Sequence, residues 1–76
     1  MKKYTLIIFN RYEVAKSKVI NYNTYEHNLG LAFREALVQL WEGEESNYKL
    51  EFDKIKGYND QIGIDFEEES YLFFLS

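Results

Sequence analysis

The sequence predicts an α+β fold, in which an antiparallel sheet of four or five strands carries one helix on one of its faces. Over residues 24–41 the apolar residues Leu29, Phe33 and Leu37 recur four apart, which is the spacing of one helical face. The segments on either side alternate apolar and polar residues, as strands do, and short connections favour antiparallel hairpins. The expected order is β-β-α-β-β-β.

The chain has 76 residues, which predicts a single domain spanning 1–76. A domain of this size has a thin stability margin, and it has no cysteine for disulfides, so six Phe, seven Tyr and one Trp must supply much of the core. The apolar run 6–9 is too short for a signal-peptide core or a membrane span. We therefore expect a cytoplasmic protein without a membrane partner.

The first two strands are predicted at Lys3–Tyr12 and Ser17–Tyr22. Tyr4, Leu6 and Ile8 fall on one face of the first strand, and Thr5, Ile7 and Phe9 fall on the other. Because both faces are apolar, the strand is expected to be central, with its second face either covered or open for contact.

The helix is predicted to begin at Asn23 or Thr24, because Asn23 and Glu26 have the spacing of a capping box. His27 would then lie in the first helical turn. No nucleophile or orienting group stands at a suitable spacing from it, so we interpret it as a surface or capping residue rather than a catalytic base.

Three further strands are predicted at Tyr48–Ile55, Gln61–Phe66 and Tyr71–Leu75, with turns at 57–60 and 67–70. Whether the last strand joins the sheet stays open. With one helix on one face, the other face would be open and would carry apolar residues such as Ile7 and Phe9 or their neighbours.

Charge is unevenly distributed along the chain, whose net charge is −4. Residues 1–41 hold six basic and three acidic residues, whereas residues 42–76 hold three basic and ten acidic residues. The two parts thus carry +3 and −7, and the acidic part needs a functional or a solubility explanation.

Motifs for catalysis or cofactor binding are missing from the sequence. The serines lie in no nucleophile-elbow pattern, and the glycines are isolated rather than gathered in a phosphate-binding loop. The acidic run 65–69 does not have the ligand spacing of a calcium loop, so we interpret it as a solvated turn. These observations predict a protein that is not an enzyme and has no cofactor or metal.

The acidic residues are instead predicted to bind a protein partner. Glu51 and Asp53 alternate on the outward face of one expected strand, and residues two apart on a strand are about 6.8 Å apart. That distance matches two phosphate steps along DNA, about 6.8 Å along the axis. The predicted contact residues are Glu42, Glu44, Glu45, Glu51, Asp53, Asp65, Glu67, Glu68 and Glu69. Asp65 and Glu67 would share a strand face if the strand extends that far.

Such a surface would mimic nucleic acid and bind a partner with a basic nucleic-acid-binding surface. An alternative is an interaction module, antitoxin-like or homodimeric, that uses the apolar open sheet face. Another is direct nucleic-acid binding by the basic residues interleaved with tyrosines before residue 23. Because the overall charge is negative, we expect no direct contact with nucleic acid.

In character the chain resembles the small acidic proteins that phages and mobile elements carry against host defence, anti-CRISPR proteins among them. The similarity lies in its length, its lack of cysteine and proline, its many Tyr and Asn residues and the acidic segment 42–69. No motif is shared, so no residue role transfers. The resemblance implies a non-enzymatic inhibitor that occupies a nucleic-acid site on a CRISPR effector or a similar enzyme in the host cytoplasm.

Overall fold

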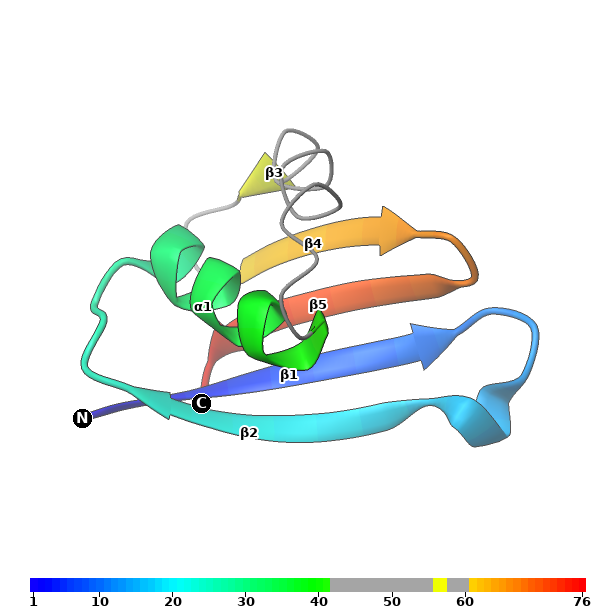
Figure 1. Ribbon diagram of the computed structural model, residues 1–76, viewed down its shortest axis with the longest axis horizontal. Coiled ribbons are helices and arrows are strands. Elements are labelled where there is room, and N and C mark those ends of the chain that lie inside the picture. The colour runs from blue at the N-terminus through cyan, green and yellow to red at the C-terminus, as the bar shows by residue number, and fades with distance from the viewer. Residues whose placement is uncertain (42–55, 58–60) are drawn as a thin grey trace.

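The computed structural model describes residues 1–41, 56–57 and 61–76. Within them a sheet is covered on one face by a single helix, α1, which confirms the α+β class (Figure 1). The elements are β1 (Lys2–Asn10), the short 3-10 helix η1 (Val14–Lys16), β2 (Lys18–Thr24), α1 (Leu29–Trp41), β3 (Lys56–Gly57), β4 (Gln61–Phe66) and β5 (Glu69–Leu75).

The sheet has the strand order β2-β1-β5-β4-β3, and each neighbouring pair is antiparallel. The hairpin between β1 and β2 is as predicted. The last strand joins the sheet at its centre, because β5 pairs with both β1 and β4. The first and last strands of the chain therefore lie side by side, with Tyr4 opposite Leu75.

Alternation along β1 directs one set of side chains into the core. Tyr4, Leu6 and Ile8 are buried beneath α1, whereas Phe9 on the opposite face is exposed. Beneath the helix the rings of Tyr4 and Phe33 flank that of Phe73, with centroid distances of 4.9 and 5.1 Å. This aromatic stack ties α1 to the two central strands.

The helix begins at Leu29, so the predicted start at Asn23 or Thr24 is wrong. Asn28 is the residue that caps it: its side-chain Oδ1 accepts the N–H of Leu31 at 3.0 Å, and its carbonyl accepts the N–H of Ala32 at 2.9 Å. Asn28 stands directly before the first apolar residue of the helical stripe, and its short polar side chain suits the N-cap position.

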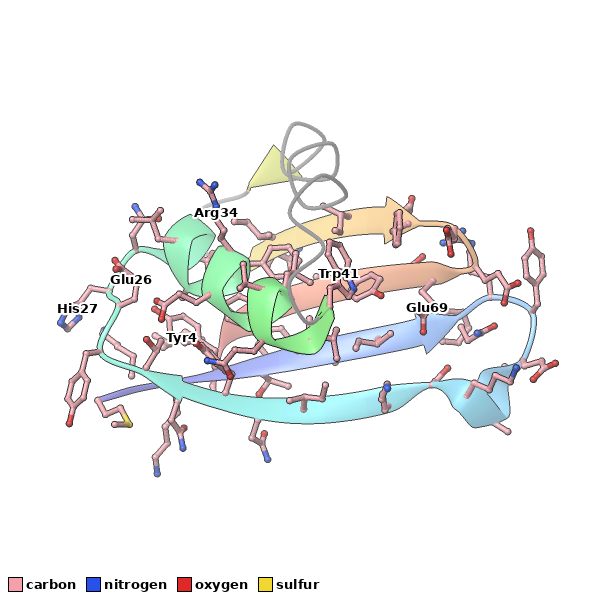
Figure 2. All side chains as sticks on the ribbon, in the orientation of Figure 1. Tyr4, Glu26, His27, Arg34, Trp41 and Glu69 are labelled. Atoms are coloured by element: carbon pink, nitrogen blue, oxygen red, sulfur yellow. The ribbon has the colours of Figure 1, made fainter. Side chains whose placement is uncertain are left out.

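The segment between β2 and α1 is instead a turn. Thr24 ends β2, and its hydroxyl accepts the N–H of Glu26 at 3.1 Å. The backbone carbonyl of Glu26 accepts the hydroxyl of Tyr4 at 3.0 Å, which fixes the turn to the core. His27 consequently lies outside the helix, before its cap, and not in its first turn (Figure 2).

The first strand ends at Asn10, two residues earlier than predicted. Asn10 is buried, and its side-chain oxygen accepts the N–H groups of Tyr12 and Glu13 at 3.0 and 2.8 Å. Its own N–H donates to Ser17 Oγ at 2.9 Å. These bonds turn the chain away from the ladder and into η1.

The predicted third strand, Tyr48–Ile55, cannot be compared with the structure, because all of it lies outside the described residues. Gly57 was expected in a turn but lies in β3, opposite Ile62 of β4. None of the described helices is long and apolar enough to cross a membrane.

Candidate interaction surface

A row of apolar side chains crosses the sheet on the face opposite α1. Ile7 of β1 is directly opposite Val19 of β2 on one side and Leu72 of β5 on the other. Opposite residues in an antiparallel ladder point to the same face, so these three side chains are neighbours.

Two aromatic side chains extend this row. Phe74 lies two residues beyond Leu72 on β5 and pairs with Thr5. Phe9 lies two residues beyond Ile7 on β1 and pairs with Ser70. Phe9 and Val19 are 44% and 64% exposed. We call Ile7, Phe9, Val19, Leu72 and Phe74 the open-face patch. An apolar patch spanning three adjacent strands of a small domain is typical of a contact surface.

Polar groups border the open-face patch. Asn21 and Asn23 of β2, together with Lys3 and Ser76, line a shallow hollow of about 370 Å³ at one end of the face. There the hydroxyls of Thr5 and Ser76 lie 2.6 Å apart. The face thus has an apolar centre and a hydrogen-bonding border.

Asp65, one of the predicted contact residues, lies at the other end of this face. Its Oδ1 is 3.6 Å from Nη1 of Arg11 and accepts the hydroxyl of Ser70 at 2.7 Å. Arg11 also donates to Ser70 Oγ at 2.9 Å and to the backbone carbonyl of Glu67. The carboxylate of Asp65 is therefore partly neutralised within the molecule.

Glu69 points to the opposite face of the sheet, toward the helix (Figure 2). Its Oε1 accepts the hydroxyl of Tyr71 at 3.0 Å, and that hydroxyl accepts the indole N–H of Trp41 at 3.3 Å. Burial, together with the hydrogen bond to the Glu69 carboxylate, raises the pKa of Tyr71 to about 12. Glu69 thus has a structural partner within the fold.

Glu67 and Glu68 form the tip of the β4–β5 hairpin, and both are exposed. Because β4 ends at Phe66 and Glu67 has a φ of 54°, Glu67 does not continue the strand face of Asp65. The strand therefore does not extend far enough for Asp65 and Glu67 to share a face, as the sequence had suggested. The four described acids hence point in different directions, and the remaining candidates Glu42, Glu44, Glu45, Glu51 and Asp53 lie outside the described residues.

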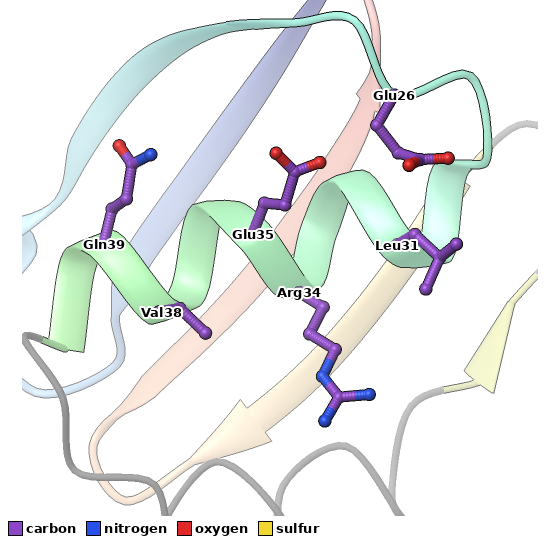
Figure 3. Close-up of a pocket in the computed structure, with 6 residues that line it drawn as sticks. All are labelled: Glu26, Leu31, Arg34, Glu35, Val38 and Gln39. Atoms are coloured by element: carbon purple, nitrogen blue, oxygen red, sulfur yellow. The ribbon is translucent and has the colours of Figure 1, made fainter.

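A second hollow, of about 430 Å³, lies over the outer surface of α1 (Figure 3). Leu31 and Val38, which are 49% and 41% exposed, supply its apolar part, and Glu35 and Gln39 border it. The sequence analysis did not identify this hollow. Its signal is that Leu31 and Val38 stand seven residues apart, on one side of the helix but off the core stripe.

Glu35 beside this hollow is held by β2. Its carboxylate accepts the hydroxyls of Thr24 and Tyr22 at 3.2 and 3.3 Å. Burial raises the pKa of Tyr22, and the Glu35 carboxylate raises it further. The pKa of Tyr4 is likewise raised, by burial first and then by Glu26 and Glu35. These bonds fix the helix to the edge strand of the sheet.

Comparison of the chain with protein families, curated proteins and solved structures finds no match. Among residues 1–41, 56–57 and 61–76, no three His, Cys, Asp or Glu residues are grouped so that they could hold a metal ion.

Proposed function

We propose that this protein is a non-enzymatic binding protein that holds a protein partner on the open face of its sheet. The observation that carries the proposal is the open-face patch, which spans β2, β1 and β5. The opposite sides of these strands form the packed core, so the patch is presented on a rigid support. An apolar centre with a polar border is the usual anatomy of a protein–protein interface.

The chemistry of this face defines the partner that it suits. Among the side chains that the structure describes, the formal charges of this face are Lys3 at one end and the Arg11–Asp65 pair at the other. A complementary partner would present an apolar surface bordered by hydrogen-bonding groups. Affinity would come mainly from buried apolar area, and binding would therefore depend weakly on salt.

Two substitutions on the face test this proposal. Val19→Lys and Phe9→Lys place a charge in the apolar contact at exposed positions, so the fold should persist while partner binding falls at least about tenfold. Val14→Lys is the matched control, because Val14 is 67% exposed in η1, outside the patch. A partner is captured with the tagged wild-type protein, and its binding to each variant is then measured at low and high salt.

Binding of the partner should persist at high salt. It should be lost with both patch variants and retained with Val14→Lys. Circular dichroism establishes that each variant is folded. If folded Val19→Lys and Phe9→Lys proteins hold the partner as well as the wild type does, the open face is not the binding surface.

A second candidate function is inhibition of a nucleic-acid-processing complex, such as a CRISPR effector, through the acidic surface. It is favoured by the exposure of Glu67 and Glu68 at one hairpin tip, together with the net −7 of residues 42–76. In this case the partner has a basic nucleic-acid-binding surface, and association weakens as salt rises.

Two variants with the same net charge separate the role of the hairpin tip from that of overall charge. The double variant Glu67→Gln with Glu68→Gln and the single variant Glu13→Lys change the net charge equally, but only the first alters the tip. Weaker, less salt-sensitive binding or inhibition in the double variant alone would support this function. Equal behaviour of the two variants would assign any effect to overall charge and remove the hairpin tip from the contact.

A further inference from the structure

The strand β2 forms one edge of the sheet, and within the described part of the chain no strand lies beyond it (Figure 1). Proteins usually protect such edges with prolines, bulges, inward charges or very short strands. β2 has seven residues in unbroken register with β1 and contains no proline. Its single charged residue, Lys18, stands at its first position.

The hydrogen bonds of β1 show which backbone groups of β2 point outward. Lys3 accepts through its carbonyl from Ser76, so alternate residues from Lys3 onward direct their backbone groups toward β5. The residues between them, such as Tyr4 and Leu6, face β2 and pair there with Tyr22 and Ile20. A strand's backbone groups alternate in direction.

The three residues of β2 that lie between its β1-facing residues consequently direct one N–H and one C=O each away from the sheet. They are Val19, Asn21 and Asn23, and all three are exposed. The outer edge of β2 is thus a regular row of backbone donors and acceptors.

We propose that a second copy of this chain pairs antiparallel along β2, about a two-fold axis at Asn21. In this register Asn21 lies opposite Asn21 of the second copy, and Val19 lies opposite Asn23 in both directions. Each of these pairs exchanges two N–H···O bonds, so every outward backbone group of the three residues is used. A register centred on Val19 or Asn23 would move part of the strand beyond its partner and leave some of these groups unpaired.

The side chains of β2 also fit this register, and they therefore favour a second copy of the chain as the partner. On the helix face, Ile20 lies opposite Tyr22 of the second copy, an aromatic and β-branched pair of the kind that stabilises sheets. Lys18 lies opposite Thr24, so the two lysines do not oppose each other. On the open face the two Asn21 amides meet and can hydrogen-bond.

This assembly goes beyond the proposed function, because it uses the strand edge rather than the open-face patch. A two-fold axis perpendicular to the sheet keeps both helices on one side and both open faces on the other. The two patches then belong to one continuous surface.

The first test is the oligomeric state of wild type and two variants at position 21, by sedimentation velocity over a range of concentrations. Asn21→Pro removes the outward N–H, which a fold tolerates at an edge position that faces solvent. We expect dimerisation at least about tenfold weaker, because one bond per copy is lost. Asn21→Thr keeps the N–H and should remain dimeric.

The second test fixes the register by charge. Asn21→Lys and Asn21→Glu each place like charges directly opposite, so each alone should be monomeric, and an equimolar mixture should form a heterodimer. This readout also serves if Asn21→Pro fails to fold. A wild type that stays monomeric at its highest soluble concentration overturns the proposal. So does a dimer that is as tight in folded Asn21→Pro as in the wild type, or one that is lost with Phe9→Lys instead, which would indicate stacked open faces.

Discussion

The hydroxyl of Tyr71 connects β5 to the end of α1. It donates to Glu69 and accepts from Trp41, and the Tyr71 and Trp41 rings meet edge to face with centroids 5.8 Å apart. Trp41 also packs against Phe66 at 5.1 Å. The neutral form of Tyr71 suits this place, because its side chain is buried and its hydroxyl lies beside a carboxylate.

The raised pKa of Tyr71 makes stability depend on alkaline pH. The tyrosine ionises near pH 10 in the unfolded chain but near pH 12 in the folded one. Its contribution to stability is therefore complete below pH 10 and is lost as pH rises toward 12, because unfolding then releases a proton. Tyr71→Phe should flatten the fall of unfolding free energy over this range.

Urea unfolding followed by circular dichroism at pH 8 to 11.5 measures this effect. The flattening will be partial, because the pKa values of Tyr4 and Tyr22 are raised as well and remain in the variant. Tyr12→Phe is the control at an exposed tyrosine and should leave the slope unchanged. An identical slope in wild type and Tyr71→Phe would contradict the assignment.

At the scale of elements, the N-cap of α1 is Asn28 and not Asn23, at which the sequence predicted that the helix begins. Asn28→Ala removes the acceptor of the Leu31 N–H and should lower the unfolding free energy by about 1 kcal/mol, whereas Asn28→Asp should retain most of it. Asn23→Ala, on the exposed face of β2, should have little effect. Thermal unfolding of the three variants decides between the two positions, and a larger loss at Asn23 would contradict the cap.

Neighbouring phenylalanines in β5 face opposite sides of the sheet. Phe73 is fully buried between Tyr4 and Phe33, so Phe73→Ala should cost about 3–5 kcal/mol. Phe74 lies on the open face, and Phe74→Ala should cost about 1 kcal/mol. Chemical denaturation of both variants tests which face is the core. Similar losses would mean that the open face is packed as tightly as the core.

The sequence predicted those elements whose pattern is complete within the segment. Alternation separated Leu6 and Ile8 from Ile7 on the two faces of β1, and the structure buries the face of Leu6 and Ile8. Other features depend on contacts between distant segments, which no local pattern contains. The central position of β5 and the pairing of Asp65 with Arg11 are of this kind. The helix start was wrong because Asn23 and Asn28 both precede helix-compatible residues.

The candidate site divides in the same way, into features predicted from a local pattern and features that depend on distant contacts. The apolar open face was predicted from the second face of β1, but the place of Leu72 beside Ile7 required the β1–β5 register. The acidic residues were predicted as one array from strand spacing together with the net −7 of residues 42–76. Polar partners distinguish Asp65 and Glu69, which are engaged within the fold, from Glu67 and Glu68, which are exposed at the hairpin tip.

At the scale of the whole molecule, the first and last strands, β1 and β5, pair with each other within the sheet. Tyr4 pairs with Leu75, and the N–H of Ser76 donates to the carbonyl of Lys3 at 2.8 Å. β1 and β5 lie side by side in the sheet (Figure 1). The β1–β5 ladder is flanked by the hairpins β1–β2 and β4–β5, which are local. Folding must therefore pay the closure entropy of nearly the full chain before the core beneath α1 can form.

Joining residues 1 and 76 through a short flexible linker removes most of that entropic cost from the unfolded state. We expect the cyclic protein to gain about 3 kcal/mol of stability, and we expect the gain to appear mainly as faster folding, because the β1–β5 pairing must precede the core. The fluorescence of Trp41, the single tryptophan, reports folding and unfolding rates in stopped-flow experiments. The control is the linear chain that carries the same linker residues at its end. If cyclisation slowed unfolding and left the folding rate unchanged, the β1–β5 ladder would form after the main folding barrier, and the two hairpins would have to assemble on α1 first.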